Sequence, residues 1–187
     1  QGDGSRDNPY VLTNAEQLAW FAKQVNLSQA SSTLSAKMTT NMDLSGLPYT
    51  GYTSAEVMAD ITKALVWVPI SEYMGGVNRF YTGTFDGNGH TITMMHVEGT
   101  EKLGLFGTLG NGANISGIVL SDNLIEAEDS TTGVQYAGGI AGYVRGTSVV
   151  ITECGNKAGS LSGYGMFFGG CVGLANGESS LILDGCY

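Results

Sequence analysis

An all-β repeat fold is predicted by three observations on this sequence. The first is the glycine motif GLFG at residues 104–107, which returns in altered form at residues 139–142 and 170–173, so that the copies start 35 and 31 residues apart. The second is an echo that follows each copy, beginning with ISGI at residues 115–118. The third is the period, because a fixed repeat of this size is typical of a solenoid or a propeller. A propeller blade usually needs about 40–50 residues, so a solenoid is favoured.

The glycines of the repeat are predicted to have a structural role. Glycine makes up 29 of the 187 residues, which is roughly twice its average share. Much of it lies in the repeat motif, and this placement favours tight turns and close backbone approach over a flexible linker. The glycines that we expect to define the repeat are Gly104, Gly107, Gly139, Gly142, Gly170 and Gly173.

The composition argues against two classes of partner. The net charge is −9, and the chain has only 8 Lys and Arg residues, which are scattered along it. Nucleic acids and anionic membranes are bound through clustered Lys and Arg, so neither is expected as a partner. No apolar run reaches the roughly 18–20 residues that span a bilayer, so we expect no membrane insertion by this segment.

Three cysteines cannot form a closed set of disulfides. Cys154 and Cys186 fall at the same place in successive repeats, and Cys171 takes the place that Ile140 has in the preceding repeat. Free thiols in an apolar core are the favoured interpretation. A disulfide between Cys154 and Cys186 is the alternative that this spacing leaves open.

Residues 1–35 are predicted to form a polar lead-in and a capping helix. Thr13 and Glu16 have the spacing of a capping box, in which each side chain bonds the backbone of the other. Apolar residues then recur at helical spacing, so we expect a helix over about residues 14–26. Its apolar stripe is expected to cover the open end of the sheets.

Residues 36–103 are predicted to form the first strands, interrupted by an insertion. Residues 36–44 alternate between apolar and polar side chains, as in a half-buried strand. A second capping box precedes a helical pattern at about residues 53–65, which predicts a helical insertion. The sequence DGNG at residues 86–89 predicts a tight turn between two strands, because Asn-Gly supplies the positive φ angles that such a turn needs.

Several stretches, taken in order, resemble the GLUG-motif family of bacterial surface proteins. The stretches that carry the resemblance are the lead-in and helix (2–26), TTNMDLSG (39–46), WVPI (67–70), YTGTFDGNGHTI (81–92), GLFG (104–107), GGIAG (138–142) and GGCVG (169–173). The likeness covers most of the chain and does not extend to residues 52–65.

The resemblance implies a right-handed parallel β-helix that is secreted or displayed on a cell surface. We therefore expect an all-β solenoid of this type, with an N-terminal capping helix, one helical insertion, and GLUG-type repeats over residues 104–187. Members of this family include adhesin-like proteins, and some of these repeats lie beside IgA-cleaving peptidases. Equivalent apolar residues stack in columns in such a fold, so Ile115, Ile151 and Leu183 are expected to lie side by side.

No catalytic constellation is found in this sequence, so we predict no enzyme activity and no cofactor. His90 and His96 lack the spacing of a zinc protease, and nothing places either of them beside a cysteine nucleophile. Asp3, Ser5 and Asp7 have the spacing of calcium-loop ligands. The glycine and the distant glutamate of such a loop are missing, so no metal site is predicted.

The ligand-binding candidates lie in a polar loop after the first repeat and in the second repeat motif. They are the acids Asp122, Glu126, Glu128 and Asp129, with the aromatic residue Tyr143. Protruding loops carry binding function more often than the scaffold does. If two of the acids faced each other, the alternative of a polysaccharide lyase or glycosidase would gain support.

We expect a non-catalytic module of a bacterial secreted or cell-surface protein, serving adhesion, ligand binding or spacing. The expected partners are a host glycan or protein, or other parts of the same protein, and the module is expected to be a monomer. Tyr187 falls inside a repeat, so we expect the natural protein to continue beyond it. The sequence shows no signal or lipid-anchor pattern of its own.

Overall fold

The structure is a computed structural model that describes residues 2–44, 66–71, 79–128, 135–164 and 167–187. The helical insertion predicted for about residues 53–65 lies outside these ranges. The helical elements of the described residues are α1 (Ala15–Leu27) and the short 3-10 helix η1 (Gln29–Thr33). The strands are β1 (Tyr10–Leu12), β2 (Ala36–Met38), β3 (Met42–Asp43), β4 (Thr84–Thr93), β5 (His96–Gly99), β6 (Lys102–Leu103), β7 (Phe106–Leu109), β8 (Asn114–Ser121), β9 (Leu124–Ala127), β10 (Tyr136–Gly138), β11 (Ala141–Val144), β12 (Val149–Thr152), β13 (Gly155–Lys157), β14 (Ser160–Gly163), β15 (Phe167–Gly169), β16 (Val172–Ala175) and β17 (Leu181–Asp184).

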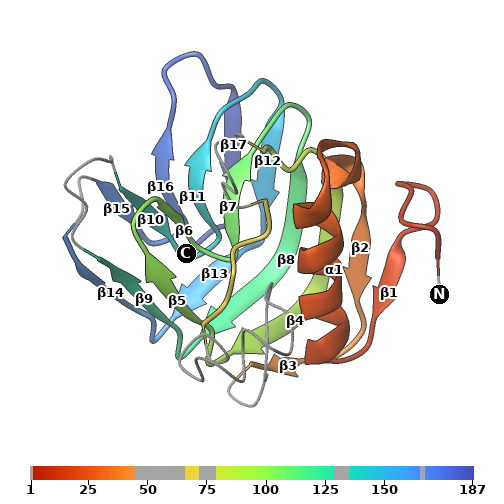
Figure 1. Ribbon diagram of the computed structural model, residues 1–187, viewed down its shortest axis with the longest axis horizontal. Helices are drawn as coiled ribbons and strands as arrows, with labels where there is room; N and C mark the ends of the chain where they lie inside the picture. Colours follow the sequence, from red (N-terminus) through yellow and green to blue (C-terminus); the bar gives the residue numbers. More distant parts are fainter. Residues whose placement is uncertain (1, 45–65, 72–78, 129–134, 165–166) are drawn as a thin grey trace.

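The strands form four separate parallel sheets around a common core (Figure 1). The largest has eight strands in the order β1-β2-β4-β8-β12-β17, with β3 beside β4 and β13 beside β8. The three smaller sheets are β15-β10-β6, β16-β11-β7 and β14-β9-β5. Among the described residues, the named strands before β5 belong to the eight-stranded sheet, and the earlier chain reaches the β16-β11-β7 sheet through the isolated bridges of Ile70 with Phe106 and of Tyr81 with Leu109.

The prediction of a single right-handed parallel β-helix solenoid is therefore wrong. The chain is mostly β with one α-helix in its described part, and its strands are divided among several small sheets. Two physical features divide them. The named strands β1–β4 all belong to the eight-stranded sheet. The corner residues Asp122 and Glu153, which follow β8 and β12, take a left-handed conformation.

Equivalent residues of successive repeats lie in register. Ile151 pairs with Ile115 on one side and with Leu183 on the other, which confirms the column predicted for these three residues. In the neighbouring sheet, Ala141 pairs with Phe106 and with Val172. Parallel pairing thus places the apolar positions of each repeat on those of the next, and the core continues through all of them.

The repeat glycines lie where the backbones of successive repeats nearly touch. A Cβ atom at Gly104 would lie 2.3 Å from the Gly138 carbonyl oxygen, and one at Gly142 would lie 2.6 Å from the Leu103 nitrogen. Gly170 differs, because nothing lies within 4 Å of the position that its Cβ would take. Side chains are therefore excluded at most of these glycines by the approach of neighbouring backbone.

Helix α1 packs on the N-terminal end of the large sheet (Figure 1). Its N-cap is Asn14, whose side chain accepts the Gln17 N–H at 2.9 Å, while Gln17 accepts the Thr13 N–H at 2.7 Å. The predicted Thr13/Glu16 capping box is thus wrong by one residue, because the Asn14 amide oxygen takes the capping position. The buried Phe21 ring lies 5.7 Å from the Phe85 ring and joins the helix to the core.

Strand β4 departs from the predicted strand-turn-strand pattern. It runs unbroken from residue 84 to 93, and its pairing with β8 shifts register between Asp86 and His90. Asn88 and Gly89 have the predicted positive φ angles of 54° and 76°. They form an irregularity inside one long strand instead of a turn, because both halves of the strand pair in parallel with the same partner.

The single strand predicted over residues 36–44 is divided into two. Both pieces pair with β4, Ala36 with Phe85 and Met42 with Ile92. The break between β2 and β3 lies opposite the irregularity in β4. Asn41 fills it, and its side-chain oxygen accepts the Thr91 N–H at 2.9 Å.

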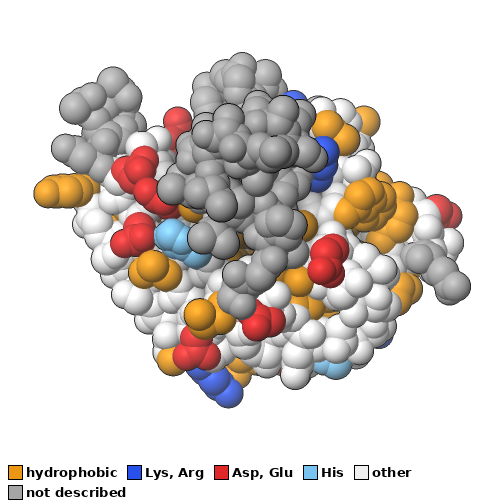
Figure 2. Space-filling model, turned by 60° about the horizontal axis from the view of Figure 1, so that its bottom comes forward, with side chains coloured by type: hydrophobic (Ala, Val, Ile, Leu, Met, Phe, Trp, Pro, Cys, Tyr) orange, Lys and Arg blue, Asp and Glu red, His pale blue; other side chains and the backbone are white. Residues whose placement is uncertain are grey.

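Uncharged surface predominates on the side of the molecule shown in Figure 2, as a charged fraction of only 13% would suggest. Among the residues that the structure describes, no helix is long and apolar enough to cross a membrane.

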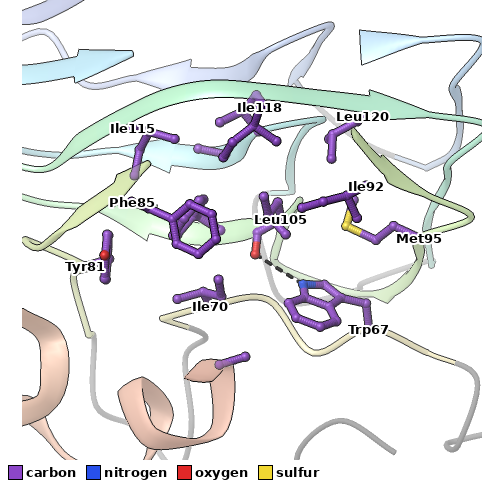
Figure 3. Close-up of a cluster of buried hydrophobic side chains, with 14 of the residues drawn as sticks. Trp67, Ile70, Tyr81, Phe85, Ile92, Met95, Leu105, Ile115, Ile118 and Leu120 are labelled. Atoms are coloured by element: carbon purple, nitrogen blue, oxygen red, sulfur yellow. Dashed lines mark hydrogen bonds between the residues drawn. The ribbon is translucent and has the colours of Figure 1, made fainter. Parts of the chain in front are cut away.

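The core is continuous between the sheets and the segment at residues 66–71 (Figure 3). The Trp67 indole Nε1–H donates to the Leu105 carbonyl oxygen at 3.2 Å, so the buried ring keeps its polar group paired. The Arg6 Nη2 group donates to the carbonyl oxygens of Thr82 and Gly112, both at 2.8 Å. These contacts attach segments that are distant in sequence to the first repeat.

Candidate functional site

Two of the predicted acids meet other ionisable side chains on the outer face of the sheet β14-β9-β5. Glu126 pairs in register with Glu98 of β5, and its carboxylate oxygen lies 3.0 Å from the His96 Nε2 atom. Glu128 follows at the end of β9 and shares a side-chain hydrogen bond with Glu98. This hydrogen bond is the main cause that raises the pKa of Glu98, and the loss of solvation and the negative charges of Glu128 and Glu126 add to it.

This acidic group is partly exposed to solvent. Figure 2 shows acidic side chains gathered beside a histidine on the side of the molecule that it presents. The Glu126 side chain is 45% exposed, so water solvates much of its charge. A glycosidase needs two carboxyl groups about 5–9.5 Å apart, with the bond to be cleaved between them. The Glu98 carboxyl group is instead close enough to Glu128 for that side chain to raise its pKa.

The other predicted site residues lie apart from one another or outside the described chain. Asp122 sits at the corner before β9 with a φ of 53°, and its carboxylate accepts the Ser121 hydroxyl at 2.7 Å. Asp129 is not among the described residues. Tyr143 lies on β11, in a different sheet from Glu126.

Tyr143 belongs to a row of aromatic rings. Its ring stacks on Tyr136 with centroids 5.0 Å apart and an angle of 15° between the planes, and Phe167 follows Tyr136 at 5.7 Å. Tyr143 and Tyr136 therefore use one face of each ring against the other. The Tyr143 hydroxyl accepts a hydrogen bond from the Asn176 amide at 3.1 Å, so its polar end points towards the loop that follows β16.

A cleft of about 420 Å³ begins at this loop. It lies where β7, β11 and β16 end, and its walls come from the loops that follow these strands. Successive segments of chain stack here as layers, and a backbone hydrogen bond joins each layer to the one before it. Gly110 N–H donates to Tyr81 O at 2.8 Å, Arg145 N–H to Leu109 O at 2.9 Å, and Asn176 N–H to Val144 O at 3.0 Å. The residues that line the cleft are Phe80, Thr82, Gly110, Asn111, Arg145, Gly146, Thr147, Asn176, Glu178 and Ser179.

The absence of a side chain at Gly110 shapes the floor of the cleft. Gly110 is the glycine of this layer. The equivalent residues in the other layers are Thr82, Arg145 and Asn176. A Cβ atom at Gly110 would lie 2.6 Å from the Phe80 Cβ, so Phe80 fits only because this residue is glycine. The Arg145 guanidinium carbon in turn lies 5.8 Å from the centre of the Phe80 ring, within the range of a cation–π contact.

Hydrogen bonds between loops hold the walls in place. The Asn111 side-chain oxygen accepts the Thr147 N–H at 2.9 Å, which joins the loops of two successive repeats. Ser179 joins the next pair, since its hydroxyl donates to Val144 O at 3.1 Å and accepts the Gly146 N–H at 3.2 Å. The cleft is therefore formed by rigid loops before any ligand arrives.

Arg145 and Glu178 both line the cleft without pairing with each other. Within the described part of the chain, neither residue forms an ion pair. The backbone N–H of Glu178 donates to the Asn176 side-chain oxygen at 2.9 Å, which fixes the start of its loop. A cation and an anion thus face one hollow, and both have hydrogen-bonding capacity for a ligand.

The three cysteines gather at the end of the core and are all free thiols. The alternative of a Cys154–Cys186 disulfide is therefore not what the structure has. Burial raises the pKa of Cys154 to about 12, and it also raises the pKa of Cys171. Thiols held protonated in this way are poor nucleophiles and poor metal ligands.

The N-terminal calcium-like spacing forms an ordinary turn. The Asp3 carboxylate accepts the Ser5 N–H at 2.9 Å, and this hydrogen bond is the main cause that lowers the pKa of Asp3. In the described ranges there is no group of three or more His, Cys, Asp or Glu side chains arranged to hold a metal ion.

Comparisons with known proteins show similarity to two proteins but do not assign the chain to a family. No family model matches it, so membership of the GLUG-motif family remains a prediction. The chain is 26% identical to halomucin of Haloquadratum walsbyi over 162 residues, which are 86% of this chain and 2% of halomucin. Among solved structures it is similar to a candidate immunoglobulin A1 protease from Bacteroides ovatus, with a TM-score of 0.45, 14% identity, and coverage of 98% of this chain and 66% of that one. A likeness at this TM-score carries no argument about function.

The sequence patterns missed the cleft. Arg145 and Asn176 each follow the last strand residue of their repeat, so aligning the repeats would have put them in one column with Gly110. Phe80 has no such signal, because it precedes the repeats and reaches the cleft only through the bridge between Tyr81 and Leu109.

Proposed function

We propose that this chain is a non-catalytic, ligand-binding module of a secreted or cell-surface protein. The observation that carries the proposal is the make-up of the cleft. Its lining has a guanidinium group, amides, hydroxyls and an aromatic ring, with Glu178 as its one carboxylate among the described residues. Such a surface can hold a ligand, while hydrolysis of a glycoside requires a second carboxylate across from the first.

Separation of the cleft from the acidic group supports the same proposal. Glu98, Glu126 and Glu128 belong to the sheet β14-β9-β5 or its end, and none of them lines the cleft. The groups with acid–base character and the hollow that can hold a ligand are thus on different surfaces. A catalytic site needs them together.

The extracellular setting rests on the similarity to halomucin and on the low charged fraction of 13% with its acidic balance. We propose as partners a host glycan or protein, or other parts of the same protein, and we propose that the module acts as a monomer. Because this chain spans 2% of halomucin, the activity of any larger protein that contains it is a separate question.

A carbohydrate-active enzyme is the second candidate, and the Glu98–Glu128 pair favours it. The hydrogen bond between the two side chains raises the pKa of Glu98, which is the property that a general acid requires.

One experiment separates the two candidates. The purified chain is incubated with neutral and acidic polysaccharides and with mucins, with and without calcium, and bound protein and released products are scored separately. Bound protein without product is the expected result. Product release that is lost in Glu98→Gln would establish the enzyme instead, and neither binding nor product would leave spacing as the function.

A further inference from the structure

We propose that the cleft binds a neutral oligosaccharide lying across successive repeats, with Arg145 and Glu178 as its principal hydrogen-bonding groups. The inference rests on the proposed function, because it names the ligand class of the same cleft. Nothing in the sequence patterns pointed to this position.

The direction of the ligand follows from the layers. Thr82, Gly110, Arg145 and Asn176 occupy equivalent positions in four successive layers. Neighbouring strands are about 4.8 Å apart, so the distance from the first of these layers to the last is roughly 14 Å. A hollow of this length along the stacking direction suits a short linear chain of sugars better than a compact ligand.

The chemistry of the lining suits hydroxyl groups. A hydroxyl can donate to the Glu178 carboxylate and accept from the Arg145 guanidinium, so one uncharged ligand can satisfy both. The Asn111 side-chain oxygen already accepts the Thr147 N–H at 2.9 Å, which leaves the amide group of this lining residue as a further donor. The Phe80 ring adds an apolar surface beside these groups, as sugar sites commonly have.

The charge distribution disfavours an acidic ligand. The chain carries a net charge of −9, and Glu178 lines the cleft itself. A uronic acid would meet Arg145 favourably but would bring its own charge close to Glu178 and into the negative field of the protein. A neutral oligosaccharide is repelled neither by Glu178 nor by the net negative charge of the protein.

The cleft is formed in advance, which favours binding by a rigid surface. Asn111, Ser179 and the Phe80–Gly110 contact fix the loops without a ligand. The Tyr143 hydroxyl accepts from Asn176 at 3.1 Å, so the row of aromatic rings joins the cleft at this amide. Preorganisation of this kind reduces the loss of conformational freedom on binding.

Calorimetric titration of the chain with neutral hexasaccharides tests the proposal. The probes are hexaoses of β-1,4-linked glucose, xylose, mannose and galactose, with a hexagalacturonate as the acidic comparison. We expect a neutral hexaose to bind and both Arg145→Ala and Glu178→Gln to weaken binding by about 10-fold or more, as for the loss of hydrogen bonds to a charged group. Thr147→Trp, which fills the cleft from an exposed position, should abolish binding.

Lys157→Ala and Glu153→Gln are matched controls, because each makes the same change in charge away from the cleft. Their affinity should equal that of the unmodified chain, and circular dichroism should show all variants folded. Tighter binding of the galacturonate than of every neutral hexaose would overturn the ligand class. Polysaccharide binding that survives Arg145→Ala and Thr147→Trp would overturn the site and leave the proposed function standing. No binding to any polysaccharide or mucin would overturn the ligand class and, with it, glycan binding as the proposed function.

Discussion

The side-chain oxygen of Asn26 accepts the backbone N–H of Ser71 at 2.7 Å, in the interior of the protein. The amide group of the same side chain donates to the Pro69 carbonyl oxygen at 3.0 Å. Asn26 lies near the end of α1 and is buried, so one side chain joins the helix to residues 66–71. The backbone groups that it satisfies have no access to water in its place.

Asn26→Ala is therefore expected to destabilise the protein by about 2–4 kcal/mol, because it leaves two buried backbone groups unpaired. Urea denaturation followed by circular dichroism measures this loss. Asn114→Ala serves as the control, since Asn114 is exposed on β8, and it should change the free energy of unfolding by less than about 0.5 kcal/mol. Equal effects of the two substitutions would show that the Asn26 hydrogen bonds contribute nothing.

Substitution by alanine should destabilise the protein at Gly142 and have little effect at Gly170. A Cβ at Gly142 would lie 2.6 Å from the Leu103 nitrogen, whereas nothing lies within 4 Å at Gly170. We expect Gly142→Ala to cost about 3 kcal/mol through overpacking against backbone. Gly170→Ala should be nearly neutral in the same thermal unfolding assay, and a comparable loss at both sites would refute the close approach at Gly142.

Stability should fall in alkaline solution through Cys154. Burial raises its pKa from 9.0 to about 12, so between these values the unfolded chain loses the thiol proton while the folded chain keeps it. The contribution to stability is present below pH 9 and is lost as the pH rises towards 12. Comparing the free energy of unfolding with that of Cys154→Ala across this range isolates the thiol from other titrating groups, and two parallel curves would contradict the prediction.

The raised pKa of Glu98 should depend on Glu128. The hydrogen bond between the two carboxyl groups is its main cause, so Glu128→Gln should return the pKa of Glu98 towards its usual value. Carboxyl carbon shifts followed by NMR during a pH titration report this directly. Glu101→Gln is the control, because Glu101 pairs with Lys102 at 3.4 Å, and a Glu98 pKa that is insensitive to Glu128 would exclude the shared hydrogen bond.

The sequence predicted the parts of the fold that depend on periodicity. Ile115, Ile151 and Leu183 stack because equal spacing and parallel pairing place the same position of each repeat side by side. The helix near residues 14–26 follows from its apolar stripe and is observed over Ala15–Leu27. Both features depend on the spacing of nearby residues, so they can be predicted from one sequence.

The division into four sheets depends on corners that the sequence does not mark. Asp122, Ser148, Glu153 and Ala158 all have φ angles between 51° and 59° without being glycine, and such conformations are set by the surrounding structure. The candidate site shows the same limit. Arg145 and Glu178 line one cleft only because separate repeats are stacked in register, and Phe80 joins the lining from outside the repeats.

The two hydrogen bonds of Arg6 constrain the order in which the molecule can assemble. Its guanidinium donates to carbonyl groups 76 and 106 residues further along the chain, so these two contacts cannot form before the first repeat is in place. Closing such long loops carries an entropic cost that later contacts must recover. The N-terminal segment is thus held in two stages, by local pairing of β1 with β2 and by the distant carbonyl groups that bind Arg6.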